Sequence, residues 1–187
     1  MLEISQALLV ATTALITLAL GAYVVAVFAA GLQKKTVARQ TVLVGGAGQH
    51  DQDVAPGAAT PAKSAPATGR GLTWFGSKFV QLALLSLTGS MIVRMFATGH
   101  PPFANHYEFA VSFAWGMILA QVYFEWRYRV RTLALVVLPV ILGMLIYAST
   151  LSYEANPLMP ALQNSPLLTV HVFTAALSYG AAVIAFG

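Results

Sequence analysis

The chain has 187 residues, of which 58% are hydrophobic and only 9% are charged. A soluble globular domain carries about 25% charged residues, so this composition and a mean hydropathy of +0.73 argue against a soluble enzyme, a secreted disulfide scaffold and a nucleic-acid binder. No cysteine is present, which excludes disulfides and thiolate metal sites. The class that remains is an integral membrane protein.

Five apolar runs are long enough to cross a bilayer, for which a helix needs about 20 residues. They cover residues 4–32, 75–98, 107–124, 132–151 and 167–187. None alternates apolar and polar residues as a barrel strand does. The first run lacks the basic flank of a signal peptide, so we expect it to be retained. These runs predict an all-α integral membrane protein with about five transmembrane helices.

A segment of different composition separates the first run from the second. Residues 36–72 are rich in Gly, Ala, Pro and Ser and have too little apolar surface to offset the entropy of ordering. We therefore expect a first transmembrane helix in 1–35, a flexible linker in 36–72 and a four-helix membrane region in 73–187.

Nine of the ten basic residues lie in two of the segments that connect the runs or, for Lys78, at the start of the second run. They are Lys34, Lys35, Arg39, Lys63, Arg70, Lys78, Arg127, Arg129 and Arg131. Because basic residues favour the cytoplasmic side, we expect the linker to be cytoplasmic and the N-terminus to lie outside with residues 99–106 and 152–166. The same distribution explains a net charge of +4 without a nucleic-acid partner.

Most remaining polar residues fall on the predicted outer side. Arg94 lies about one turn from the outer end of its run, and it either reaches the interface or binds an anionic ligand group such as a carboxylate. Asn105 is suited to be a helix N-cap, and Glu108 falls at the third helical position of a capping box. His100 and His106 flank the same segment and are expected to be loop residues rather than ligands.

His171 lies about one helical turn into the fifth run, without an acidic residue near it in the sequence. Such an imidazole is either packed and bonded to backbone or an axial ligand for haem iron. Ala175 and Ser178 share its helix face, with Ala182 further along. Small side chains of this kind let a neighbouring helix or a flat macrocycle approach closely.

Two segments on the predicted outer side resemble motifs of the CcsA/ResC family of cytochrome c biogenesis proteins. Residues 99–108, GHPPFANHYE, resemble the family's G-H-x-P-x-x-N-x-Y-E segment. Residues 158–181, LMPALQNSPLLTVHVFTAALSYGA, resemble its P-A-L-Q-S-x-x-L-x-x-H-V-x-x-x-x-x-S-Y-x-A segment. The resemblance covers Arg94 to Gly187. The family's W-G-x-x-W-x-W-D segment is not present, so we expect this chain to be the N-terminal, truncated part of such a protein.

The resemblance implies that the chain handles haem b as a transported substrate. It implies delivery to apocytochrome c on the outer face of a bacterial inner or plasma membrane, or of a thylakoid membrane in a plastid, together with a CcsB/ResB-type membrane partner. His171 aligns with the family's axial ligand to haem iron, and Arg94 with an arginine for which we predict pairing with a haem propionate. The family acts in a haem-attachment (synthase) complex. With one haem ligand, this chain is expected to be inactive alone.

A second hypothesis needs no haem: a non-catalytic membrane subunit or assembly factor of a larger respiratory or photosynthetic complex. It rests on small residues along helix faces, which favour close helix packing. These are Gly21, Ala29, Gly31, Ala175, Ser178 and Ala182. A transporter fragment is disfavoured, because the apolar runs lack the paired charges and broken helices of transporter sites.

Overall fold

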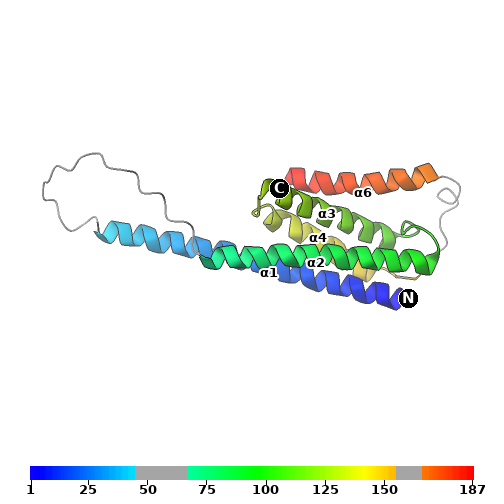
Figure 1. Cartoon of the computed structure of the whole chain (residues 1–187), viewed down its shortest axis with the longest axis horizontal. Helices are drawn as coiled ribbons and strands as arrows, with labels where there is room; N and C mark the ends of the chain where they lie inside the picture. The colour runs from blue at the N-terminus through cyan, green and yellow to red at the C-terminus, as the bar shows by residue number, and fades with distance from the viewer. Residues whose placement is uncertain (45–66, 155–165) are drawn as a thin grey trace.

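A computed structural model describes residues 1–44, 67–154 and 166–187, and within them it contains five α-helices and no strand. The helices are α1 (Leu2–Val44), α2 (Ala67–Thr98), α3 (His106–Tyr128), α4 (Ala134–Thr150) and α6 (Pro166–Phe186). Figure 1 shows α1 and α2 as a long antiparallel pair, with α6 on the opposite side of the bundle from α1. The predicted all-α class is therefore confirmed.

Three of the described helices are long and apolar enough to cross a membrane. The apolar stretches are Leu2–Leu32 in α1, Gly71–Thr98 in α2 and Thr169–Phe186 in α6. The apolar helix α4 is shorter, with 17 residues. The 23-residue α3 buries the polar side chains of Glu108, Gln121 and Glu125, which lower its hydropathy. The five helices thus occupy the five predicted runs, and the membrane-protein class is confirmed.

Helices α1 and α2 extend further into the segment 36–72 than predicted. α1 continues to Val44 and α2 begins at Ala67. Residues 36–44 contain neither Gly nor Pro, so nothing in them interrupts a helix, and two glycines follow Val44. α2 begins directly after a proline, a residue that favours the start of a helix. The predicted flexibility of the remaining residues, 45–66, concerns a part of the chain outside the described residues.

Hydroxyl side chains join α1 to α2. The Oγ atoms of Ser5 and Ser90 lie 3.0 Å apart, and the Ser90 hydroxyl also donates to the Ser5 carbonyl at 2.7 Å. The Ser86 hydroxyl donates to the carbonyl of Leu8 at 3.0 Å. Small hydroxyl residues allow helices in a membrane to approach closely and to form hydrogen bonds across the interface. The two helices are therefore held together by polar as well as apolar contacts.

The ends of α3 are formed by local backbone chemistry. Asn105 is extended, with φ −141° and ψ 171°, and its Oδ1 accepts a hydrogen bond from the Glu108 N–H at 2.9 Å. This confirms Asn105 as the N-cap. At the other end Arg129 takes a left-handed conformation with φ 56°, and its N–H donates to the Glu125 carbonyl. The polypeptide turns sharply there before α4.

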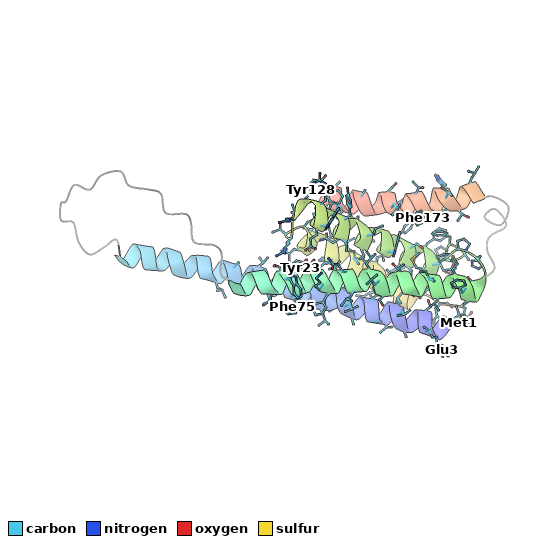
Figure 2. The ribbon with its side chains drawn as sticks, viewed as in Figure 1. Met1, Glu3, Tyr23, Phe75, Tyr128 and Phe173 are labelled. Atoms are coloured by element: carbon cyan, nitrogen blue, oxygen red, sulfur yellow. The ribbon has the colours of Figure 1, made fainter. Side chains whose placement is uncertain are left out.

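The bundle has two chemically different ends. Figure 2 shows Met1 and Glu3 at one end, which we call the N-terminal end, and Figure 1 places the α2–α3 connection and the start of α6 there as well. Tyr23, Phe75 and Tyr128 lie toward the other end, which we call the basic end. The basic residues whose side chains are described there are Lys78, Arg127, Arg129 and Arg131.

Candidate functional site

A buried ion pair lies at the N-terminal end between α2 and α3. The Nε of Arg94 donates to Oε1 of Glu108 at 2.7 Å, and the two side chains are only 3% and 0% exposed. The other carboxylate oxygen, Oε2, accepts from the Ala104 N–H at 2.6 Å. The predicted capping box is thus modified: Glu108 reaches the amide before the N-cap, and its carboxylate also binds Arg94.

Arg94 has further contacts that connect three parts of the chain. Its guanidinium lies 4.7 Å from the centre of the Tyr107 ring, and its Nη2 donates to the carbonyl of Glu154 at 3.2 Å. The Asn105 amide donates to the same carbonyl at 3.1 Å. Arg94 therefore joins the end of α2, the start of α3 and the segment after α4. Its buried Nη1 atom has no hydrogen-bond partner among the described residues.

The sequence missed this ion pair. Arg94 and Glu108 lie 14 positions apart, and each had a local explanation of its own, at the interface and at a helix cap. The available signal was their depth: an acid and a base stand on consecutive helices at the same end of the bundle. A buried charge is costly unless it is paired, so that coincidence would have predicted the contact.

His171 lies on the exposed surface of α6. It lines a shallow groove of about 440 Å³ together with Thr174, Ala175, Ser178, Tyr179 and Ala182. The hydroxyls of Thr174 and Ser178 donate to backbone carbonyls of α6 itself, at 2.8 Å and 2.9 Å. This is the helix face predicted from the sequence. Its small side chains leave the imidazole accessible.

The His171 groove faces away from the rest of the described protein. α6 packs against α3 through Ala176 and Gly180, both buried. At about 100° per residue, Gly180 stands half a turn around the helix from His171. Arg94 lies between α2 and α3, and no hydrogen bond, ion pair or pocket joins it to His171 within the described residues. The two predicted site residues are therefore in different surroundings.

Of the two other histidines at the N-terminal end, His100 belongs to the loop, as expected, and His106 is the first residue of α3. The Nδ1 of His100 lies 2.9 Å from the carbonyl oxygen of Pro101, and His106 is exposed at the first residue of α3. Among the residues that the structure describes, no group of three or more His, Cys, Asp or Glu side chains is placed to hold a metal ion.

An apolar pocket of about 370 Å³ lies between α2, the 99–106 segment, α3 and α6. Met91, Met95, Phe103, Trp115 and Phe173 are among its lining residues, and the Trp115 and Phe173 rings are 5.7 Å apart. The pocket has no titratable side chain, and its wall is apolar apart from the thioether sulfurs of Met91 and Met95. It shares α6 with His171 but uses the opposite face of that helix. The sequence did not predict this pocket, because its residues come from four separate segments.

A second buried carboxylate lies at the basic end. Both oxygens of Glu125 are 3.0 Å from the Tyr23 hydroxyl, which donates to this carboxylate across α1 and α3. Arg131 approaches the same carboxylate, with its Nε 3.9 Å from Oε1, and donates to the Thr73 hydroxyl at 2.8 Å. The bundle thus has one bound carboxylate at each end, and both are contributed by α3.

Removing the Tyr23 hydroxyl should destabilise the protein. We expect Tyr23→Phe to lower the free energy of unfolding by about 1–3 kcal/mol, because the buried Glu125 loses its hydrogen-bond donor. Unfolding of the purified protein in mixed micelles measures this. Tyr123→Phe is the control, since Tyr123 is 52% exposed. Equal effects of the two substitutions would show that the Glu125 hydrogen bond contributes nothing.

The chain is similar to curated proteins described as cytochrome c biogenesis protein CcsA. It is 37% identical over 107 residues to that of Gloeobacter violaceus, which covers 55% of this chain and 31% of the relative. It is 33% identical over 118 residues to that of Chlorella vulgaris, covering 61% and 36%, and 36% identical over 109 residues to one of Prochlorococcus marinus, covering 56% and 34%. The chain thus spans about one third of the length of these relatives. No protein-family model and no solved structure matches it.

Proposed function

We propose, from the relationship of this chain to the CcsA cytochrome c biogenesis proteins, that it takes part in cytochrome c biogenesis by binding haem as a substrate. The observation that carries the proposal is the accessible imidazole of His171 in its groove on α6. An ionisable residue within a membrane segment marks a functional site by default, since it is costly to keep there without one.

The chemistry of the groove suits one face of a haem. A neutral imidazole offers a nitrogen lone pair to haem iron as an axial ligand. Ala175, Ser178 and Ala182 follow along the same helix face, and such small residues allow a flat macrocycle to approach the helix. The hydroxyls of Thr174 and Ser178 donate to backbone carbonyls of α6. The imidazole of His171 is therefore the group in the groove that is suited to bind iron. A second axial ligand has to come from another part of the assembly.

The finer steps belong to the same proposal. The haem is haem b, and it is delivered to apocytochrome c at the outer face of a bacterial inner or plasma membrane, or of a thylakoid membrane. A CcsB/ResB-type partner packs beside the chain. This is supported by the direction of the His171 groove, which faces away from the described helices, toward the space that a partner or a ligand can fill.

Arg94 has a separate place in the proposal. Its Nε and Nη2 are bound to Glu108 and to the Glu154 carbonyl, so its main role is to hold the outer segments together. Only Nη1 lacks a partner among the described residues, and it is buried. We propose that it contacts a haem propionate once the residues that cover it move apart. The guanidinium is thus an anchor first and a ligand contact second.

The haem content of the purified full chain tests the role of His171. We expect His171→Ala to lower it at least about 10-fold, since even the loss of a group that only supports a metal ligand costs about 10- to 100-fold in affinity. Reduced-minus-oxidised absorption spectra of protein purified from haem-supplied membranes measure this. His106→Ala removes an exposed histidine at the same end and should leave haem content unchanged.

Imidazole in the buffer distinguishes a ligand from a structural residue. Because His171 is exposed in an open groove, free imidazole can occupy the space left by His171→Ala and restore the spectrum. Haem bound equally by the wild type and by His171→Ala would overturn the assignment of His171.

The competing function, a non-catalytic assembly factor, is favoured by one observation. α6 packs on α3 and only slightly on α4, and most of its apolar stretch is uncovered, with 17% of it buried. A helix exposed in this way suits packing in a larger complex. If the purified chain carries no haem, and His171→Ala leaves the maturation of c-type cytochromes intact, the assembly function replaces the haem-binding one.

A further inference from the structure

A polar pocket of about 450 Å³ lies at the basic end, away from His171. Ser77 and Gln81 of α2 form one wall, and Val122, Glu125 and Trp126 of α3 form another. Arg129 and Arg131, from the segment that follows α3, complete it. None of these residues takes part in the proposed binding of haem.

The pocket has an excess of positive charge. Its one acidic residue, Glu125, is 9% exposed, and its carboxylate is bound by the Tyr23 hydroxyl and approached by Arg131. Arg129 is exposed and has no acidic partner among the described residues. Lys78 lies beside the pocket and donates to the Gln81 side chain at 3.0 Å. The pocket therefore contains the guanidinium of Arg129, which has no acidic partner among the described residues, and the neutral amide of Gln81. The carboxylate of Glu125 beneath them is already bound by Tyr23.

The backbone directs Arg129 to this place. α3 ends where Arg129 adopts φ 56°, a left-handed conformation that side-chain-bearing residues rarely take. A glycine there would end the helix at lower cost. The turn puts Arg129 and Arg131 on the same pocket, whereas Arg127 remains on α3 and stacks on Tyr128, with its guanidinium 5.6 Å from the ring centre.

Exposed aromatic side chains place the pocket at the level of lipid headgroups. Trp126 is 75% exposed, Tyr128 58% and Trp74 50%, and Figure 2 shows Phe75 and Tyr128 toward this end. Trp and Tyr gather where the apolar core of a membrane meets water. Basic pockets between helices at this level bind lipid headgroups that carry phosphate.

We propose that this pocket binds a phosphate group, that of an anionic phospholipid, through the guanidinium of Arg129. Guanidinium groups bind phosphate with two parallel hydrogen bonds. Gln81 offers a further polar contact from α2, and the exposed Trp126 ring borders the site on the side of the lipid. The ion pair between Arg131 and Glu125 supports the floor of the pocket and leaves Arg129 for the ligand.

Arg129→Gly tests the proposal without threatening the fold. It removes the guanidinium and places glycine at the one described non-glycine position with positive φ, where glycine is favoured. Arg127→Gly would place a helix-destabilising glycine in the last turn of α3, so Arg127→Gln is the control. It removes the same charge at the same end of the protein, from a residue outside the pocket.

Native mass spectrometry of the full chain released from nanodiscs of phosphatidylglycerol or phosphatidylcholine gives the readout. We expect retained phosphatidylglycerol to fall about 10-fold in Arg129→Gly, the loss typical of a hydrogen-bonded charge, and to be unchanged in Arg127→Gln. Equal loss in both variants, or equal retention of the two lipids by the wild type, would overturn the proposal, because diffuse surface charge then explains any binding.

A competition with inorganic phosphate distinguishes the two sources of the group. Retention of phosphatidylglycerol in the presence of millimolar phosphate identifies the lipid as the occupant. Displacement of the lipid, with phosphate bound by the wild type and not by Arg129→Gly, identifies free phosphate at the same site. If the wild type binds neither, the pocket has no phosphate site.

Discussion

Glu108→Gln is expected to destabilise the protein by about 3–5 kcal/mol, the cost of breaking a buried ion pair by removing one partner. The amide keeps the size of the carboxylate and an oxygen that can accept from the Ala104 N–H. It does not keep the charge that faces Arg94, whose side chain is 3% exposed. The guanidinium is then buried without a counter-charge, and its hydrogen bond to the Glu154 carbonyl is weakened, which leaves the one from the Asn105 amide.

Two further variants show whether this effect belongs to the pair. Glu3→Gln removes an exposed acid at the same end and should change stability by less than about 0.5 kcal/mol. The double variant Arg94→Met with Glu108→Gln should recover part of the loss, since replacing both members of a buried pair is often close to neutral. Unfolding free energies of the wild type and of these variants, measured in mixed micelles, show how strongly Arg94 and Glu108 stabilise each other. If Glu108→Gln is no worse than Glu3→Gln, the ion pair has no stabilising role.

The positions of the helices followed from the sequence because bilayer thickness imposes a length on apolar runs. The N-cap at Asn105 also followed, since a cap depends on neighbours within three residues. The far end of α1 was misjudged for the opposite reason: residues 36–44 are polar enough for a connecting segment, but they contain no helix-breaking residue. The composition of these residues indicates that they are polar, but it does not predict whether their backbone is helical.

Contacts between distant residues were beyond the sequence. The small residues at 175, 178 and 182 were expected to let either a helix or a macrocycle approach. Their spacing in the sequence does not distinguish helix packing from ligand binding. In the structure the helix contact uses Ala176 and Gly180 instead, which leaves the first set in the His171 groove. The pairing of Arg94 with Glu108 likewise depends on how α2 and α3 pack, and the only sign of it in the sequence is that the two charges stand at the same end of consecutive helices.

Gly180 and Gly116 allow α3 and α6 to cross with their backbones in contact. A Cβ atom on Gly116 would lie 2.5 Å from the carbonyl oxygen of Ala176, and one on Gly180 would meet the carbonyl oxygen of Gly116. Both obstacles are backbone atoms, which cannot rotate away as a side chain can. Gly180→Ala should therefore separate the two helices and destabilise the protein by about 1–3 kcal/mol, the usual cost of overpacking, despite the better helix propensity of alanine.

Gly143→Ala is the matched control for this substitution, because Gly143 lies within α4 and a Cβ there has nothing within 4 Å. It should leave stability unchanged or raise it by up to about 1 kcal/mol. His171 and the crossing lie on opposite faces of α6. Gly180→Ala should therefore lower the unfolding free energy, while the protein that remains folded still binds haem. His171→Ala should remove haem binding and leave the unfolding free energy unchanged. If Gly180→Ala removes haem binding from the folded protein, the binding site includes the α3–α6 contact, and the outward face of α6 is not sufficient for it.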